Sequence, residues 1–320
     1  MKILFSDSHI YPFVKFSGTG KNVTAWPSGS GKYVHDLMVK ALAEKGHEIF
    51  YMIESSGNVL LPKGVKIINK YKDDIDIVHL AARCTPEVSA YYQSKQIPVL
   101  ATNHLYRPNE KPPFKWVHVS KTLADMYNEK QFVWIGLDPD DFIFSNKKQD
   151  YFLFMADISR HREKGLDVAL KLAVERNFKL VVAGSSRKQK DIDTVQAWCN
   201  ECKAIYVGDV RGKNKAELLS TAKALISPSR LPETFGLTLA EALFSGTPVI
   251  CSNTGAYKEI ITKQVGFICS NENEYHQAID AIDAISPETC LEYAMNNFHY
   301  KKTTEKYLPI YEEMLLNKTN

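Results

Sequence analysis

The chain has little of what marks a secreted, membrane-spanning or nucleic-acid-binding protein. Its six cysteines are scattered, which favours reduced thiols and a cytoplasmic location. The apolar run at residues 2–7 is too short for a signal peptide or a membrane span, so we expect at most peripheral membrane association. The formal net charge of +3 comes without a dense lysine or arginine run, so the sequence carries no strong signal for nucleic-acid binding.

Three motifs that would indicate other chemistries are incomplete or absent. Cys199 and Cys202 form a lone C-x2-C pair without a second pair at zinc-site spacing, so we predict no metal site. The string before Lys32 is not a phosphate-binding P-loop, because Trp26 and Tyr33 stand where that motif needs a glycine and a Ser or Thr. No G-x-G-x-x-G string follows an early strand, which argues against an NAD(P)-dependent oxidoreductase.

What is present is a regular alternation of short apolar runs and helical patterns. A chain of 320 residues, 44% of them hydrophobic, fits two domains of about 150 residues each. Short apolar runs that alternate with helices indicate an α/β fold with parallel strands buried on both faces. The predicted strands are residues 2–7, 48–54, 75–81, 98–103, 116–120 and 132–135, and then 151–156, 180–183, 204–207, 224–227, 248–251 and 266–269. The predicted helices include residues 33–45, 166–176, 213–221 and 237–245.

The two sets of about six strands predict two Rossmann-like, doubly wound domains. The polar, turn-rich stretch at residues 136–150 is the expected boundary between them. Ligands of such folds bind outside the carboxyl ends of the strands. Two facing domains would therefore form the active site in the central cleft between them.

Residues 227–259 are the most informative segment of the chain. Glu233 and Glu241 stand eight positions apart, with Phe235-Gly236-Leu237 between them. The pattern predicts a strand, a loop with one carboxylate, and a helix with a second carboxylate. The start of a helix offers free backbone N–H groups and a positive dipole end, which suit a phosphate. Because carboxylates accept hydrogen bonds from vicinal hydroxyls, the segment could hold a nucleotide sugar between its two acids.

This pattern resembles the donor site of the retaining glycosyltransferases with the GT-B fold, family 4. The resemblance extends along the chain: residues 41–49 are similar to the family's first helix-to-strand turn, 135–142 to its interdomain segment, and 151–170 to the start of its donor domain. It implies an N-terminal acceptor domain at residues 1–144 and a nucleotide-sugar donor domain at residues 145–299. Residues 300–320 would then contain a helix, matched over 300–316, that packs back on the first domain.

The resemblance also implies roles for the acidic segment. Glu233 would contact the hydroxyls of the donor sugar and stabilise positive charge at the anomeric carbon. Glu241 would bond the ribose hydroxyls. The alternatives for the two are a surface loop acid and an exposed helix acid. The groups that would hold the diphosphate are the backbone N–H groups of Phe235, Gly236 and Leu237, assisted by the hydroxyl of Thr238.

The leaving diphosphate needs cations, which arginine and lysine supply without a metal. Lys164 resembles the family's diphosphate lysine. The family has Gly-Arg directly after the preceding strand, where this chain has Ala156-Asp157. Arg160 or Arg162 could supply the missing guanidinium, and Arg160 is the favoured candidate. The alternative for both is a solvated basic loop.

Further candidates lie in other parts of the chain. Gly29 and Gly31 precede the first predicted helix and resemble the family's loop near the donor phosphate. His104 follows a predicted strand and resembles a cleft histidine that contacts the reacting sugar, with a structural histidine as the alternative. Val210 and Arg211 stand where the family has its nucleobase pocket.

The implied function is transfer of a hexose-type sugar from a nucleotide-diphosphate donor, with a UDP-sugar favoured, to a hydroxyl acceptor. The reaction would retain the anomeric configuration and would need neither a metal nor a bound cofactor. Acceptor contacts are expected from residues 8–13 and 21–28. The alternatives are another GT-B enzyme such as an epimerase or a phosphorylase, an oxidoreductase on the same topology, and a catalytically inactive GT-B protein that binds a nucleotide sugar or serves as a partner subunit.

Overall fold

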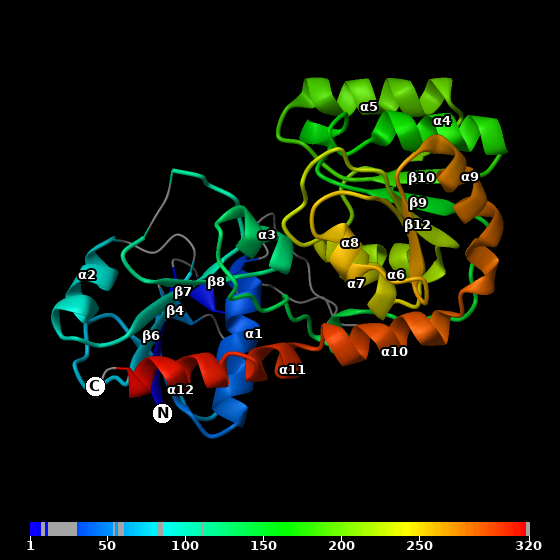
Figure 1. The fold of residues 1–320 in the computed structure, drawn as a ribbon. Coiled ribbons are helices and arrows are strands. Elements are labelled where there is room, and N and C mark those ends of the chain that lie inside the picture. The colour runs from blue at the N-terminus through cyan, green and yellow to red at the C-terminus, as the bar shows by residue number, and fades with distance from the viewer. Residues whose placement is uncertain are drawn as a thin grey trace. The chain divides into compact units, whose positions relative to one another are not determined.

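The chain forms two compact units, each built on one six-stranded sheet (Figure 1). The computed structural model describes residues 1–7, 10–11, 31–53, 55–56, 61–81, 86–109 and 112–317. The first unit contains the described residues up to Asp138 together with those from Asn297 onward. The second unit contains those from Pro139 to Asn296.

Both sheets are parallel and share one strand order, β5-β3-β1-β6-β7-β8 in the first and β11-β10-β9-β12-β13-β14 in the second. Counted along the chain within each sheet, both orders are 3-2-1-4-5-6, the doubly wound Rossmann order. The first sheet contains β1 (Lys2–Ser6), β3 (Glu48–Met52), β5 (Val65–Ile68), β6 (Ile77–Leu80), β7 (Val99–Asn103) and β8 (Lys115–His118). The second contains β9 (Phe152–Met155), β10 (Leu180–Ala183), β11 (Ile205–Tyr206), β12 (Ala224–Ser227), β13 (Val249–Ser252) and β14 (Gly266–Cys269). A separate parallel pair joins β2 (Ile10–Tyr11) and β4 (Ser55–Ser56).

Helices cover both faces of the second sheet. Buried residues of α4, α5 and α9 share one core with strands of that sheet, and Figure 1 shows α4 and α5 on the opposite side from α6 and α7. The helices of the first unit are α1 (Gly31–Glu44), α2 (Pro86–Ser94), α3 (Lys121–Met126), α11 (Tyr300–Glu305) and α12 (Leu308–Leu316). Those of the second are α4 (Leu166–Arg176), α5 (Gln189–Glu201), α6 (Gly212–Thr221), α7 (Leu237–Phe244), α8 (Tyr257–Ile260), α9 (Glu272–Ala281) and α10 (Pro287–Asn297), with the short 3-10 helices η1 (Pro139–Asp141), η2 (Ile158–Arg160) and η3 (Ile282–Ala284).

The expected α/β fold with two Rossmann-like sheets is confirmed. Consecutive residues of the central strands are fully buried, for example Leu4 and Phe5 in β1 and Leu225 and Ile226 in β12. Successive side chains of a strand point to opposite faces, so burial of every residue requires that both faces be covered. This is why unbroken apolar runs, rather than alternating ones, predicted the strands.

Two details of the first unit differ from the prediction. The expected strand at residues 132–135 is only a single bridge between His118 and Phe132. The chain leaves the sheet there, because Leu137 pairs instead with His299 in the C-terminal segment. The edge strand β5 was not predicted, since only one of its four residues, Val65, is buried.

The C-terminal segment forms two helices, not the single helix expected over residues 300–316. Helix α11 ends at Glu305, and α12 begins at Leu308 with Pro309 in its first turn. Proline lacks an N–H group, and its ring would clash with the carbonyl four residues earlier, which is that of Glu305. A continuous helix is therefore interrupted at this point.

Both C-terminal helices pack within the first unit, as expected. A Cβ atom at Gly136 would lie 2.5 Å from Cα of Tyr300, so the chain before η1 touches the backbone of α11 directly. The hydroxyl of Tyr311 lies 2.6 Å from Nδ1 of His79, and Nε2 of His79 lies 2.7 Å from Oγ1 of Thr102. All three side chains are buried. Burial holds the pKa of His79 well below its usual value, so the imidazole is neutral.

Tyr311→Ala tests how much this docking stabilises the first unit. Tyr311 is fully buried, so its removal leaves a cavity and takes a hydrogen-bond partner from His79. We expect a loss of about 3–5 kcal/mol of unfolding free energy. Leu316→Ala is the control, because Leu316 is 67% exposed and its truncation should change stability by less than about 0.5 kcal/mol. Thermal and urea unfolding followed by circular dichroism would measure both. Equal stability of the two variants would contradict the docking role.

Candidate active site

Three loops meet at one edge of the second sheet. They follow the carboxyl ends of β9, β12 and β13, which are neighbours in the parallel sheet. The first loop carries Lys164, the second Glu233, and the third Gly255. The carboxyl edge is where doubly wound folds bind their ligands.

Lys164 and Glu233 form the central ion pair of this edge. Nζ of Lys164 lies 2.6 Å from Oε1 of Glu233, and the two side chains are 20% and 14% exposed. The buried Ser229 donates a second hydrogen bond to the same oxygen, at 2.7 Å. The carboxylate that sequence analysis assigned to the donor sugar is thus already oriented by two partners from its surroundings.

Glycines let the loops approach at backbone contact distance. Gly165 has φ +79°, and a Cβ atom there would lie 2.0 Å from the carbonyl oxygen of Pro228. Gly255 has φ +51°, and its Cβ atom would lie 2.3 Å from both the backbone nitrogen and the carbonyl oxygen of Glu233. No side chain fits at either position, so the sequence requires glycine at both.

Arg230 ties the first two loops together. Its guanidinium forms a bidentate pair with Asp167 at 2.8 and 2.7 Å, and it also donates to the carbonyl of Arg162 at 2.5 Å. Its backbone N–H donates to the carbonyl of Glu163 at 2.7 Å. The hydrogen bonds from Arg230 hold the pKa of the Asp167 carboxyl below its usual value. These contacts flank Lys164 on both sides in the sequence.

The start of α7 presents an uncapped helix end after Glu233. Gly236 is the N-cap residue with φ +111°, and no side chain caps the helix. A Cβ atom at Gly236 would lie 2.7 Å from the ring of Tyr257, which packs beneath it. The first N–H groups of a helix have no partner within the helix, so this end can accept an anion. Of the neighbouring residues, the side chain of Phe235 is buried, and Leu237 and Thr238 are half-buried.

Burial raises the pKa of Tyr257 well above its usual value, and the charge of Glu233 adds to the effect. Its hydroxyl lies 3.0 Å from Oγ of Ser227, the last residue of β12. Tyr257 is therefore a neutral phenol that packs against Gly236 and faces the negative charge of Glu233.

Glu241 is buried, so it is not the exposed helix acid that was the alternative interpretation. It is 3% exposed, and its Oε2 lies 2.7 Å from Nζ of Lys215 on α6. A buried carboxylate needs such a partner, because an unpaired charge in an apolar environment is costly. The structure thus pairs the second glutamate of the motif with a lysine that sequence analysis did not single out.

The two arginines of the basic loop differ in their surroundings. The guanidinium of Arg162 lies over the ring of Trp198 at 4.8 Å, which occupies it in a cation–π contact. Arg160 is exposed, and no ion pair joins its side chain to any residue in the part of the chain that the structure describes. Asp157, at the position where the resemblance implies an arginine, caps η2 by accepting hydrogen bonds from the backbone and hydroxyl of Ser159.

The candidates for the nucleobase lie at the start of α6. Arg211 is its N-cap residue, is exposed, and pairs with Asp209 at 2.8 Å. Val210 is half-buried. Nearby, Ile205 and Val207 are 44% and 41% exposed, which leaves apolar side chains at the end of β11.

The first unit brings two of the predicted residues together. A Cβ atom at Gly31, the first residue of α1, would lie 3.5 Å from Nε2 of His104. Burial of the imidazole, with a smaller contribution from the charge of His35, lowers the pKa of His104 to about 4, so the ring is neutral at physiological pH. Gly29 and the acceptor candidates at residues 8–9, 12–13 and 21–28 lie outside the described residues.

The match to known sequences covers the unit that contains this site. Residues 140–300, about half of the chain, match the family described as glycosyl transferases group 1. The chain belongs to this family.

Curated relatives are similar to this chain over part of their length. An uncharacterized glycosyltransferase of Methanocaldococcus jannaschii is 30% identical over 156 residues, which are 45% of this chain and 38% of that protein. The O-antigen chain mannosyltransferase RfbU of Salmonella typhimurium is 25% identical over 178 residues, which are 52% of this chain and 49% of that protein. The chain therefore spans less than half of the length of these relatives.

Solved structures match the whole described fold. AviGT4, a glycosyltransferase involved in avilamycin A biosynthesis, gives a TM-score of 0.72 at 20% identity and covers 99% of this chain and 98% of that chain. HepE of Anabaena, in complex with UDP and glucose, gives 0.69 at 13% identity and covers 98% and 100%. At these identities the likeness shows the fold alone, and that fold is the two-domain α/β GT-B architecture. Across the described ranges, no helix has both the length and the apolar character that a membrane crossing requires.

Sequence analysis missed the residues that hold the site together. Ser229 and Arg230 stand inside the informative segment, but their partners are fixed only by the fold. Tyr257 also stands inside this segment but was not singled out, and Lys215 lies outside it. Gly165 directly follows Lys164, and a glycine at that position was a readable sign of close backbone contact.

Gly165→Ala tests the loop contact, with Gly208→Ala as its control. Both glycines have similar φ, +79° and +72°, but a Cβ atom at Gly208 meets nothing within 4 Å. The backbone conformation alone should cost about 1–2 kcal/mol at each position. The clash with Pro228 should cost about 1–3 kcal/mol more at Gly165. Urea denaturation of the two variants measures the difference, and equal losses would contradict the steric role of Gly165.

Proposed function

We propose that this protein is a retaining, metal-independent glycosyltransferase that moves a hexose-type sugar from a nucleotide-diphosphate donor to a hydroxyl acceptor. The observation that carries the proposal is the Lys164–Glu233 pair, 2.6 Å apart, directly before the uncapped start of α7. It places a cation, a carboxylate and free helix N–H groups at one edge of the sheet. We propose the second unit as the donor half and the first as the acceptor half.

Departure of a nucleoside diphosphate builds negative charge on phosphate oxygens, and this site can neutralise it with side chains. The N–H groups at Gly236, Leu237 and Thr238 would bind the diphosphate, as helix N-termini bind phosphates elsewhere. Lys164 would donate to a phosphate oxygen. Arg160 is exposed, and its side chain has no ion pair with any described residue, so it would supply the second cation.

Glu233 would bind the hydroxyls of the donor sugar and stabilise positive charge at the anomeric carbon. Its Oε1 contacts both Lys164 and Ser229, so the carboxylate is held in one orientation before substrate arrives. Because the carboxylate is already in place, little energy is spent on moving it when positive charge develops on the sugar. Lys164 contacts the carboxylate of Glu233 and, as proposed, a phosphate oxygen. It would therefore lie between the donor sugar and the leaving diphosphate.

Glu241 would accept hydrogen bonds from the ribose hydroxyls. Lys215 supports this role, since its ammonium lies 2.7 Å from Oε2 of Glu241 and gives the buried carboxylate a partner of opposite charge. Val210 and Arg211 would flank the nucleobase. A UDP-linked hexose is the favoured donor. The UDP and glucose bound to HepE support both the nucleotide and the sugar, and the mannosyltransferase among the relatives supports a hexose.

Retention would follow from attack on the same face that the diphosphate leaves, with the departing phosphate accepting the proton of the acceptor hydroxyl. This arrangement needs no separate general base. In the acceptor half, His104 beside Gly31 would contact the reacting sugar, and its low pKa keeps it a neutral hydrogen-bonding group. The role proposed for Gly29, near the donor phosphate, rests on the family resemblance, since this residue lies outside the described residues.

The competing function is a catalytically inactive GT-B protein that binds a nucleotide sugar. The observation that favours it is Asp157, which puts a carboxylate where the family has an arginine. Asp157 is engaged in capping η2, so its charge is partly offset by the N–H and hydroxyl donors of Ser159. Turnover distinguishes the two functions, since an active enzyme and an inactive protein would both bind the donor, but only the enzyme would transfer or hydrolyse it.

Glu233→Gln and Lys164→Ala should each lower turnover by about tenfold or more, because each removes charge that acts on the transition state. Glu201→Gln and Lys190→Ala, which alter exposed residues of α5, are the matched controls and should keep wild-type turnover. Release of nucleoside diphosphate from the donor is the readout, with circular dichroism to verify folding. Near-normal turnover in either site variant would contradict its assignment.

A thermal-shift and calorimetric screen of UDP, GDP, ADP and their sugar conjugates tests the donor class. A ligand that binds only the native state raises the unfolding midpoint, and at equal concentration a tighter ligand raises it more. We expect UDP and a UDP-hexose to raise it equally with magnesium and with a chelator. A shift that requires magnesium would contradict metal independence, and binding without any turnover would favour the inactive protein.

A further inference from the structure

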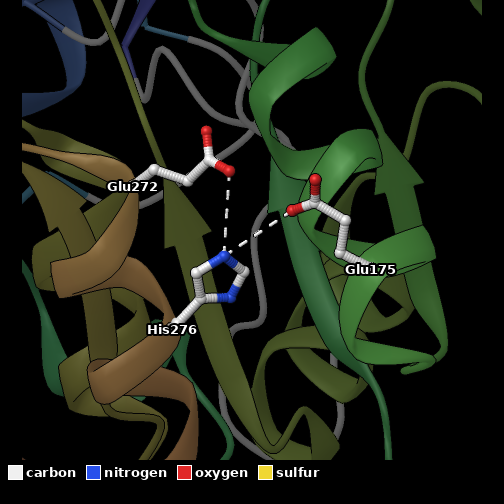
Figure 2. Close-up of side chains that lie close together, drawn as sticks. All are labelled: Glu175, Glu272 and His276. Atoms are coloured by element: carbon white, nitrogen blue, oxygen red, sulfur yellow. Dashed lines mark ion pairs between the residues drawn. The ribbon is translucent and has the colours of Figure 1, made fainter.

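A second cluster of chemically active side chains lies between two helices of the donor half. Glu175 stands near the end of α4, and Glu272 and His276 stand one turn apart on α9. Residues four apart lie on the same face of a helix, so both side chains of α9 face α4. Figure 2 shows the imidazole of His276 between the two carboxylates.

The distances within this cluster are close to those of a metal site. Nε2 of His276 lies 3.6 Å from Oε2 of Glu175 and 3.9 Å from Oε1 of Glu272. The three ligand atoms all lie within 4.8 Å of one another. Two atoms bound to one tetrahedral zinc ion at about 2.1 Å lie about 3.4 Å apart. Each histidine–carboxylate distance is thus within about 0.5 Å of that required to share an ion.

A neighbouring lysine leaves these atoms available. Nζ of Lys171 pairs with Oε2 of Glu272 at 2.5 Å and with Oε1 of Glu175 at 3.5 Å. Each carboxylate therefore offers one oxygen to Lys171 and the other to His276. The oxygens nearest His276 are therefore not the ones that Lys171 contacts. With a neutral imidazole, the two carboxylates and one ammonium sum to a charge of −1, which favours a cation.

We propose that Glu175, Glu272 and His276 bind one divalent transition-metal ion, with zinc the expected ion, and that this ion links α4 to α9. One imidazole and two carboxylates suit zinc, whereas magnesium and calcium prefer oxygen ligands alone. Water would complete the coordination. The ion is structural: it supports the donor half and takes no part in sugar transfer.

The test uses the full chain freed of metal with a chelator. About 50 μM zinc chloride should raise the midpoint of thermal unfolding by at least about 2 °C, because the ion binds only the folded helix pair. The same concentration of magnesium should leave the midpoint unchanged. No shift with zinc, or an equal shift with magnesium, overturns the proposal.

Variants locate the site. His276→Gln and Glu272→Gln should each lower zinc affinity in calorimetry by about tenfold or more, since even outer partners of a metal site contribute that much. Glu292→Gln, at an exposed position of α10, is the matched control and should bind zinc like the wild type. Full binding in His276→Gln shows that zinc is held elsewhere and overturns the proposal.

X-ray absorption of the zinc-loaded protein distinguishes this cluster from binding by cysteine. The described cysteines are free, so thiolates could also capture zinc. We expect nitrogen and oxygen neighbours at about 2.0–2.2 Å and no sulfur shell. A sulfur shell at about 2.3 Å would overturn the assignment.

Discussion

The candidate active site depends on the close approach of loops that follow neighbouring strands. Lys164 and Glu233 are 69 positions apart in the sequence, and they meet because the backbone of Gly165 touches that of Pro228. Gly255 allows a similar approach beneath Glu233. A Cβ atom at either glycine would lie 2.0 or 2.3 Å from the backbone of the opposing loop, so the loops would have to move apart. Whether the charged residues form a site therefore depends on how closely the loop backbones can approach. The pattern of charges in the sequence does not contain this information.

The central strands of the second sheet were predictable from the sequence because they are covered on both faces. Residues such as 180–183 and 224–226 are buried without interruption, so an apolar run is the direct trace of their environment. The edges of the first sheet were less predictable from the sequence. Strand β5 is an edge strand with one buried residue. Residues 132–135 have the pattern of a strand but leave the sheet after a single bridge. Long-range pairing with His299, which a local pattern does not contain, decides the second case.

The site shows the same division between local and distant information. The glutamate pair and the lysine were found because their chemistry is concentrated in short segments. The roles of Ser229, Arg230 and Lys215 could not be predicted, because each consists of a contact with a residue that the fold alone brings near. Asp157 is the reverse case: the sequence marks it as a departure, and the structure shows a local cap that occupies it. Functional roles for these residues stay predictions.

The return of the C-terminal segment to the first unit has a consequence for the order in which the protein forms during synthesis. Domains of a growing chain commonly fold in the order of their appearance at the ribosome. Here the first unit lacks Tyr307 and Tyr311, which bond Thr102 and His79 in its interior, until translation has passed residue 311. The sheet of the second unit is drawn from one continuous stretch, residues 152–269, and can close earlier. The unit that emerges first is thus completed last, and its unfinished interior must be protected while the other is made.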